Sequence, residues 1–343
     1  MNVETIVAVI AIVLALGFDF VNGFHDTANA VATVIYTKAL KPGVAIVMSG
    51  LLNFLGAVVV GTAVAQVITK IIPAETVTLP IVVAVLVAAL VWNLITWWYG
   101  IPVSSSHCLI GSLFGAGVAA AGLEGVEWHE LEKVFLALLI SPIMGFGAGA
   151  LMTWVSLKLS KEKDKTPGTK QAQSPVMRWL HIFSSAAVSF SHGSNDGQKT
   201  MGIITLILAT HFASFGYKID EVPLWVMVSA ATAIGLGTVI GGWRIIRTVG
   251  TKISRERLSH SQGFGASMST ALIILIASTY GAPISTTHTL SSAVAGGTIP
   301  VHGREKLNPK TLWLIVLAWV LTVPVAVALS ALSYIIIRAV WHA

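Results

Sequence analysis

Charged side chains are scarce in this chain. Lys, Arg, Asp and Glu together form 10% of its 343 residues, hydrophobic residues form 55%, and the mean hydropathy is +0.81. A soluble domain needs many more charged residues to cover its surface, so this class of protein is excluded. We therefore expect a multi-pass protein of the cell membrane, in contact with the lipid bilayer.

Cysteine is almost missing as well. Cys108 stands alone, which excludes an intrachain disulfide and offers neither a thiol pair nor the spacing of a metal site. The chain also lacks the HExxH and GxSxG patterns of hydrolase sites. We expect no enzyme activity and no organic cofactor.

Basic residues are absent from most of the connecting segments. Of the 21 Lys and Arg residues, 16 lie in four segments, 37–43, 158–178, 244–259 and 301–310. Because Lys and Arg concentrate in cytoplasmic loops, these segments are predicted to face the cytoplasm. Orientation in the membrane thus accounts for the positive charge, and no nucleic-acid partner is expected.

Ten apolar stretches account for most of the remaining chain. They run roughly over 3–36, 43–69, 79–99, 101–121, 134–157, 179–214, 222–243, 264–280, 282–300 and 311–341. A crossing takes about 20 residues, so the long first and sixth stretches, which contain Gly and Asn beside an acid, are predicted to be broken helices. The choice between ten and twelve helical segments stays open.

Loop charge also predicts how the chain is folded across the membrane. The four basic segments share one side only if 79–121 and 264–300 each enter the membrane and return as a re-entrant helical hairpin. The halves 1–157 and 179–343, joined by the basic cytoplasmic linker 158–178, then have opposite orientations. We predict an all-α membrane protein of two inverted-topology repeats, each with about five to six transmembrane segments.

Two motifs occur twice and support the duplication. FVNGFHD, which ends at Asp26, matches FSHGSND, which ends at Asp196, at an offset of 170. YGIPVSSSH, which ends at His107, matches YGAPISTTH, which ends at His288, at an offset of 181. The difference of 11 residues is assigned to a longer loop, the basic segment 244–259.

Acidic residues are rare within the apolar stretches. Apart from Glu4 at the start of the first stretch, only Asp19, Asp26 and Asp196 of the 15 acids lie there, and each charge near the bilayer centre costs about 2.5–3.5 kcal/mol. Oxygen-bearing side chains surround two of these acids, and hard cations prefer oxygen ligands. We predict one sodium site in each half, with opened helices contributing carbonyl groups. The predicted sodium ligands are Asn22, Asp26 and Asn29 in the first half and Asn195 and Asp196 in the second.

Other interpretations of these residues stay open. Asp26 or Asp196 could bind a proton instead of a metal ion, and Asp196 could form an internal ion pair with Lys199, three residues further along a helix. Lys199 could equally contact an anion. Asp19 has no counterpart in the second half, and we assign it no role.

Three consecutive hydroxyl residues follow a proline in each copy of the second motif. At the tip of a hairpin, Ser104–Ser106 and Ser285–Thr287 would lie at a helix N-terminus, where free N–H groups bind anions. The predicted anion ligands are Ser104, Ser105, Ser106, Ser285, Thr286 and Thr287. The alternative is that the hydroxyls only cap helices or join them. His107 and His288 could donate to the same anion or contact a carbonyl group.

The segments GFHDTANA at 23–30 and SHGSNDGQKTMG at 191–202 resemble the two acidic signatures of the inorganic phosphate transporter (PiT) family of sodium- or proton-coupled permeases. The paired P-[VI]-S-[ST]-[ST]-H segments are similar too, so the resemblance covers both halves. It implies phosphate as substrate, inverted repeats, a homodimer, and essential roles for Asp26 and Asp196. Phe24-His25-Asp26 and Gln198-Lys199 depart from the usual motifs, which leaves the coupling ion open.

The predicted function is secondary active uptake of phosphate with sodium, by alternating access around a mid-membrane site formed by both repeats. Moving a dianion into an inside-negative cell costs about 2.3 kcal/mol per charge per 100 mV, so two sodium ions per dianion are expected. The alternative is a proton-coupled phosphate or sulfate permease. A membrane enzyme and an ion channel are further alternatives, although internal duplication is more typical of a carrier.

Overall fold

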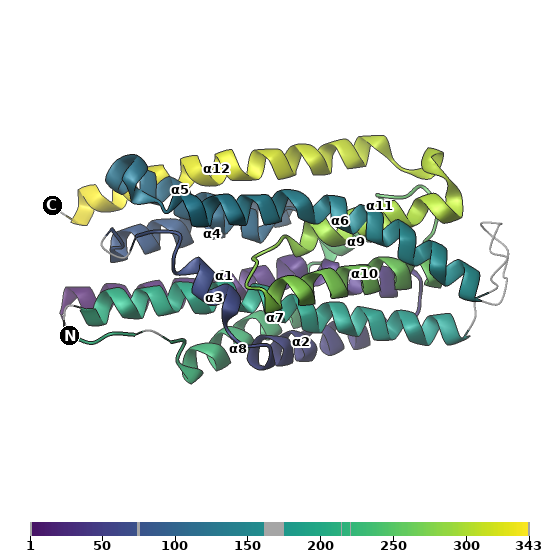
Figure 1. Cartoon of the computed structure of the whole chain (residues 1–343), viewed down its shortest axis with the longest axis horizontal. Helices are drawn as coiled ribbons and strands as arrows, with labels where there is room; N and C mark the ends of the chain where they lie inside the picture. Colours follow the sequence, from purple (N-terminus) through teal and green to yellow (C-terminus); the bar gives the residue numbers. More distant parts are fainter. Residues whose placement is uncertain (1, 74–75, 161–174, 214, 220, 342–343) are drawn as a thin grey trace.

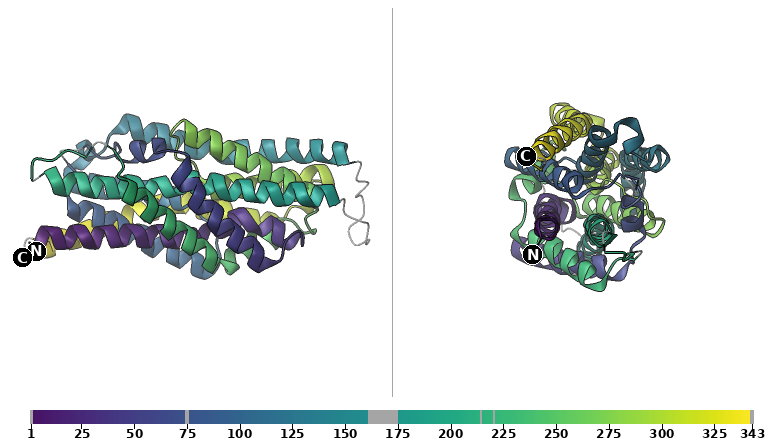
Figure 2. Two further views of the ribbon diagram at one scale, coloured as in Figure 1. Left: turned by 90° about the horizontal axis from the view of Figure 1, so that it is seen from below. Right: turned by 90° about the vertical axis from the view of Figure 1, so that its left-hand side faces the viewer.

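The computed structural model describes residues 2–73, 76–160, 175–213, 215–219 and 221–341. Long helices lie side by side along one axis and form an elongated bundle (Figure 1 and Figure 2). The described residues contain no β-strand, and Ser254 and Leu307 form a single isolated bridge. The predicted all-α class is confirmed.

The same order of helices occurs twice along the chain. The first half contains α1 (Val3–Tyr36), α2 (Pro42–Val59), α3 (Ala63–Ile68), α4 (Leu79–Tyr99), α5 (Ser105–Ala121) and α6 (Trp128–Ser160). The second half contains α7 (Pro175–Ala213), α8 (Leu224–Ile240), α9 (Trp243–Thr251), α10 (His260–Thr279), α11 (Thr286–His302) and α12 (Pro309–Trp341). Each of the ten predicted apolar stretches therefore contains at least one helix. The sequence predicts a loop over 244–259, but its first part belongs to the helix α9, whose basic residues are more typical of a loop.

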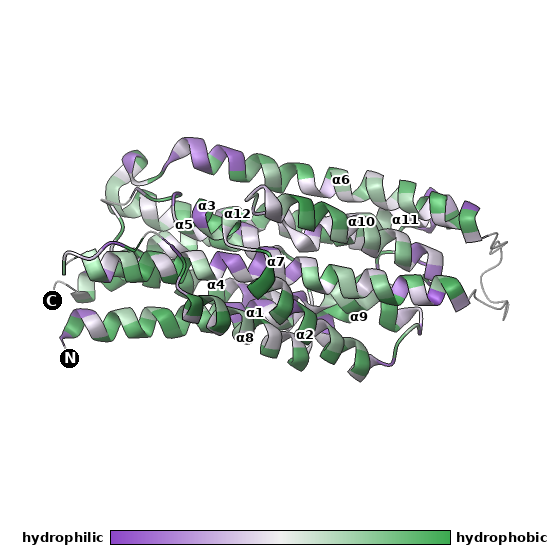
Figure 3. Cartoon of the chain, turned by 60° about the horizontal axis from the view of Figure 1, so that its bottom comes forward, coloured by the Kyte–Doolittle hydropathy of each residue, from purple (hydrophilic) through white to green (hydrophobic). Residues whose placement is uncertain are grey.

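Within the described part of the chain, seven helices are long and apolar enough to cross a membrane, or eight if the bent pair α8 and α9 counts as one crossing. α7 is not among them because hydrophilic residues occupy its middle, as Figure 3 shows. These helices make the chain a multi-pass protein of the cell membrane. The linker 161–174 lies outside the described residues, and the flanking parts of the predicted linker 158–178 belong to α6 and α7.

Broken helices are present, but not at the acidic motifs. α1 and α7 continue without interruption past Gly23 and Gly193, so their backbone carbonyl groups stay within the helices. The breaks lie between α2 and α3 near Gly61, and between α8 and α9 near Gly241, where the helix axes differ by 68°. Both glycines have positive φ, at 95° and 76°, which a residue with a side chain rarely adopts.

The glycines of the acidic motifs permit close helix packing instead. A Cβ atom at Gly23 would lie 2.3 Å from the Ile234 carbonyl oxygen, and one at Gly193 would lie 2.0 Å from the Asn53 carbonyl oxygen. α1 therefore lies directly against α8, and α7 against α2. The expected opening of the helices at these glycines is wrong, because the missing side chains bring neighbouring helices together.

The basic loops meet at one end of the bundle, as predicted. The Arg178 Nε atom donates a hydrogen bond to the carbonyl group of Ala39 at 3.0 Å, which joins the start of α7 to the loop after α1. The Arg255 amide donates to the carbonyl group of Lys306 at 2.8 Å, which joins the loop before α10 to that before α12. The described residues of the segments assigned to the cytoplasmic side therefore lie together.

The opposite end carries a cavity of about 1030 Å³. Val3, Leu79, Ala120, Thr210 and Tyr334 all line it, so α1 and α4 begin there, and α5, α7 and α12 end there. Figure 1 shows both chain termini at this end. α4 and α5 therefore form a hairpin with both ends at this end of the bundle, and α10 and α11 form one with both ends among the basic loops.

The offsets of the two repeated motifs differ by 11 residues, and the second half contains these extra residues at a different place from the one predicted. Pro42 and Leu224, which begin α2 and α8, are 182 positions apart, whereas the acidic motifs differ by 170. The shift therefore occurs before α8, in the longer C-terminal part of α7 and in the connection after Ala213. The assignment of the insertion to 244–259 is wrong, since that segment contains α9, the counterpart of α3.

Candidate functional site

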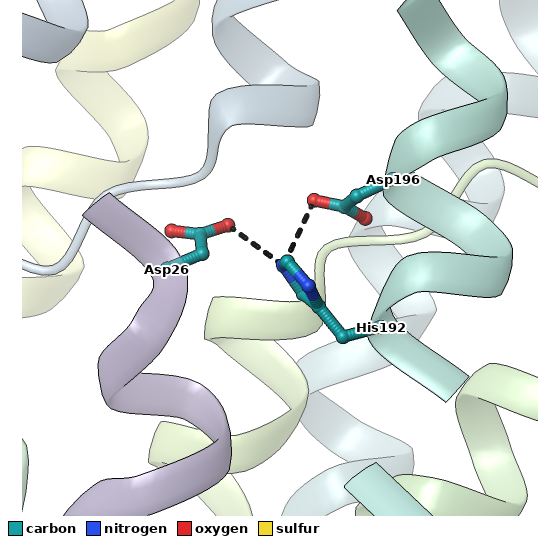
Figure 4. Close-up of side chains that lie close together, drawn as sticks. All are labelled: Asp26, His192 and Asp196. Atoms are coloured by element: carbon teal, nitrogen blue, oxygen red, sulfur yellow. Dashed lines mark ion pairs between the residues drawn. The ribbon is translucent and has the colours of Figure 1, made fainter. Parts of the chain in front are cut away.

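Asp26 of α1 and Asp196 of α7 face each other across one imidazole ring (Figure 4). The Nε2 atom of His192 lies 3.7 Å from Oδ2 of Asp26 and 3.4 Å from Oδ2 of Asp196. All three side chains are buried. The two acids were predicted to mark separate sites, one in each half, but the structure brings them into one cluster.

The antiparallel packing of α1 on α7 brings the acids together. Asn22 donates to Asp196 at 3.3 Å, and Ser185 donates to the carbonyl group of Ala30 at 2.6 Å. Residue numbers thus rise along α1 as they fall along α7. Both helices contribute the residue pattern of the acidic motif to the same contact, so the duplicated motifs meet at the centre of the bundle.

Asp26 receives hydrogen bonds from both hairpin tips. Ser105 of α5 donates to its Oδ2 atom at 3.2 Å, and Thr287 of α11 donates to its Oδ1 atom at 3.2 Å. Thr286 reaches Oδ2 at 3.5 Å, and His25 Nδ1 lies 2.8 Å from Oδ1. The hydroxyl groups predicted to bind an anion therefore surround a carboxylate.

The predicted asparagine ligands differ in what they contact. Asn29 donates to Thr287 at 2.9 Å, and Asn22 donates to Asp196. The amide of Asn195 instead faces α10 and its tip, where it donates to Ser278 and to the carbonyl group of Ala282, both at 3.1 Å. The Oδ1 atom of each asparagine is buried and accepts no hydrogen bond from a described residue. These oxygens can serve a cation.

Lys199 forms the ion pair with Asp196 that was one of the open interpretations. Its Nζ atom lies 2.5 Å from Oδ1 of Asp196 and 2.5 Å from the hydroxyl group of Ser106. The carbonyl oxygen of Ile284 is 3.5 Å away, and Ser106 itself donates to that oxygen at 2.9 Å. The lysine is 1% exposed, so its charge is balanced within the protein.

The first hydroxyl residue of each triad is a helix cap. Ser104 accepts a hydrogen bond from the His107 amide at 3.1 Å, and Ser285 accepts one from the His288 amide at 3.1 Å. Capping, the alternative considered for all six hydroxyls, thus holds for these two residues. The other four, Ser105, Ser106, Thr286 and Thr287, lie at the N-termini of α5 and α11 and face the acidic cluster.

His107 and His288 join the two tips. Their ring centroids are 4.4 Å apart, and His288 also stacks on Trp319 of α12 at 3.9 Å. Neither Nδ1 of His107 nor Nε2 of His288 has a hydrogen-bond partner in the described ranges. The pair therefore packs where the hairpins meet.

Several polar residues of the cluster were not predicted. His192 also binds Asn53 of α2, whose Oδ1 atom is 2.9 Å from Nδ1, and Asn53 donates to Thr238 of α8 at 2.8 Å. Asn53 is a polar residue in an otherwise apolar stretch, and this contrast is the sequence signal that identifies it as a candidate site residue. Asp19 is fully buried, and its carboxylate has no hydrogen-bond partner in the part of the chain that the structure describes.

Comparison with known proteins shows the family to which the chain belongs. Residues 22–330 match the sequence profile described as "Phosphate transporter family". The chain is 41% identical to the "Probable low-affinity inorganic phosphate transporter" of Bacillus subtilis (strain 168), over 99% of this chain and 100% of the relative. It is 29% identical to the "Low-affinity inorganic phosphate transporter PitB" of Escherichia coli (strain K12), over 95% of each. A solved structure, "The sodium-dependent phosphate transporter", aligns with a TM-score of 0.83 and 29% identity, over 97% of this chain and 99% of that chain.

Proposed function

The chain belongs to the phosphate transporter family, and from this premise we propose that it is a secondary active transporter that takes up inorganic phosphate together with sodium ions. Proteins of this family are transporters and not enzymes. One observation carries the proposal: two buried acids from two repeats meet the hydroxyl groups of two hairpin tips in one cluster. The sodium-dependent transporter of similar fold supports the choice of cation.

Sodium binds at Asp26 in this proposal. The carboxylate lies near Asn22 and Asn29, whose buried Oδ1 atoms accept no hydrogen bond from the described residues. Carboxylate, amide and hydroxyl oxygens form a ligand set that suits a hard monovalent cation. A buried carboxylate is costly without a compensating positive charge, which favours cation binding.

Phosphate binds beside the cation, at the N-termini of α5 and α11. Ser105, Ser106, Thr286 and Thr287 donate there, and the two helix N-termini add free amide groups and a positive dipole. Ser105 and Thr287 donate to Asp26, whose negative charge repels an anion. Sodium at Asp26 would neutralise this charge and release the hydroxyl groups, so each substrate favours binding of the other.

The inverted repeats are proposed to provide alternating access. Three features support this proposal: the hairpins enter from opposite ends, α1 and α7 are antiparallel, and α6 packs on α11 as α12 packs on α5. Movement of the hairpins against α6 and α12 would expose the cluster to one side at a time. The homodimer that the family resemblance implies remains a further prediction.

Proton coupling is the second candidate, favoured by the place of His192 between two carboxylates. Uptake of labelled phosphate and sulfate into proteoliposomes, with a sodium gradient, a proton gradient or neither, separates the candidates. We expect saturable phosphate uptake driven by sodium. Uptake driven by a proton gradient alone would show that protons, and not sodium ions, are the coupling ion. Uptake that needs no gradient and does not saturate would contradict a carrier.

A further inference from the structure

The two repeats differ in charge at one position shortly after the acidic motif. Three residues after the acid, the first repeat has Asn29 and the second has Lys199, at the same offset of 170 that relates Asp26 to Asp196. One copy of the site thus has a neutral amide where the other has a positive charge.

Asn29 and Lys199 contact matching hydroxyl residues of the two hairpin tips. Asn29 donates to Thr287 at 2.9 Å, and Thr287 lies 3.2 Å from Asp26. Lys199 lies 2.5 Å from Ser106, the counterpart of Thr287 at an offset of 181, and 2.5 Å from Asp196. Each group therefore contains an acid, the side chain three residues after it, and the third hydroxyl residue of the opposite repeat's hairpin tip.

The ammonium group of Lys199 has the surroundings of a bound cation. Three oxygens face it: the Asp196 carboxylate, the Ser106 hydroxyl at 2.5 Å, and the Ile284 carbonyl at 3.5 Å. An ammonium group has three donors, so these oxygens match its full capacity. In the first repeat the Oδ1 atom of Asn29 accepts no hydrogen bond from any described residue, which leaves a ligand for a mobile ion.

We propose that the ammonium group of Lys199 permanently occupies the second cation site, so that the transporter carries one sodium ion, at Asp26, with each phosphate. The inference rests on the proposed sodium-coupled function and replaces the expected two sodium ions. A covalently attached charge balances Asp196 but does not cross the membrane. The transported complex therefore gains one positive charge from the solution and not two.

The number of sodium ions per phosphate tests this inference in the unmodified protein. Proteoliposomes are supplied with labelled sodium and labelled phosphate. The initial sodium flux is then divided by the initial phosphate flux. We expect a ratio of one. A ratio of two would overturn the inference without any variant. Phosphate uptake with no sodium flux would contradict the proposed sodium coupling itself, which is a distinct outcome.

Lys199→Asn provides the sharper test because it makes the second repeat like the first. The ratio of sodium to phosphate should rise from one to two. Without the ammonium group of Lys199, a second sodium ion can bind at Asp196 with the new amide oxygen as a ligand. Lys218→Asn is the matched control, because it makes the same exchange at an exposed lysine in the connection before α8 and should keep the ratio at one. A Lys199→Asn protein that transports at a ratio of one, with a weaker affinity for phosphate, would instead make Lys199 an anion contact and overturn the inference.

Asn29→Lys supplies an independent test if Lys199→Asn does not fold. A second ammonium group would occupy the site at Asp26, and binding of labelled sodium to the purified protein should be lost. Retained sodium binding of one ion per protein in this variant would overturn the assignment of the mobile ion to Asp26.

Discussion

Ser105, at the tip of the first hairpin, donates to Asp26 at 3.2 Å and lies 3.5 Å from the Oδ2 atom of Asp196, so a single hydroxyl group contacts the acids of both repeats. Three elements that are far apart in the sequence, α1, α5 and α7, thus share one polar contact. The same hydroxyl lies at the N-terminus of α5, where an anion would bind. This relationship couples the proposed cation and anion sites.

Ser105→Ala should weaken phosphate binding more than Ser104→Ala. Loss of a hydrogen bond to a charged group is worth roughly 1.5–3 kcal/mol, so half-maximal uptake should need roughly 10- to 150-fold more phosphate. Ser104 caps α5, and its removal should lower stability by about 1 kcal/mol with a smaller effect on phosphate. Concentration series of uptake and thermal unfolding in detergent measure both effects. Equal effects on phosphate from the two variants would contradict the site.

Asp26→Asn and Asp196→Asn should both abolish sodium-driven uptake but differ in stability. Asp196→Asn leaves the buried Lys199 without its carboxylate, which costs about 3–5 kcal/mol. Asp26 has no lysine partner among the described residues, so Asp26→Asn should unfold at a higher temperature than Asp196→Asn. Normal uptake by both variants would disprove the assignment of the acids.

His192→Asn tests whether the imidazole compensates the two acids. The exchange copies Asn22, the residue at this position of the first repeat, and leaves the carboxylates facing each other with less compensation. Sodium should then raise the unfolding temperature by more than it does in the unmodified protein, because a bound cation relieves the repulsion and stabilises the folded state. The comparison uses thermal unfolding with sodium and with a large organic cation. An unchanged sodium effect would mean that His192 does not compensate the acids.

Gly193→Ala should destabilise the protein, whereas Gly147→Ala should not. The added Cβ atom at Gly193 would lie 2.0 Å from the Asn53 carbonyl oxygen, which separates α7 from α2 and disturbs His192 and Asn53 together. Around Gly147, no described atom beyond the adjoining backbone of its own helix and its two neighbours in sequence lies within 4 Å of the added Cβ atom. Alanine is favoured over glycine in a helix by about 1 kcal/mol, so this control should be neutral or slightly stabilising. Thermal unfolding and uptake rates of the two variants give the result.

Much of the fold could be predicted because hydrophobicity and charge act locally. The ten apolar stretches became helices, since a backbone in lipid must satisfy its own hydrogen bonds. The hairpin tips followed from Pro102 and the hydroxyl residues after it, because proline and an N-cap mark the start of α5. The basic loops were correctly grouped at one end because loop charge follows the membrane side.

The position of α9 and the continuity of α1 and α7 could not be predicted. α9 is rich in arginine, and in sequence it resembles a loop, although Ile245, Ile246 and Val249 give it a buried face. Glycines at 23 and 193 suggested open helices, yet they serve close packing. Whether a glycine bends its own helix or accommodates a neighbouring one depends on the neighbour, which the sequence does not identify.

The amino-acid sequence determined that this is a duplicated membrane protein with two buried acids and two hydroxyl-bearing hairpin tips, because these properties depend on residue type, spacing and hydrophobicity. Only the tertiary structure decided that Asp26 and Asp196 share His192, that Ser104 and Ser285 are caps, and that Lys199 lies beside Asp196 and Ser106. These contacts join residues up to about half the chain apart, and the packing angle and register of helices set them. Neither is encoded in any short stretch of sequence.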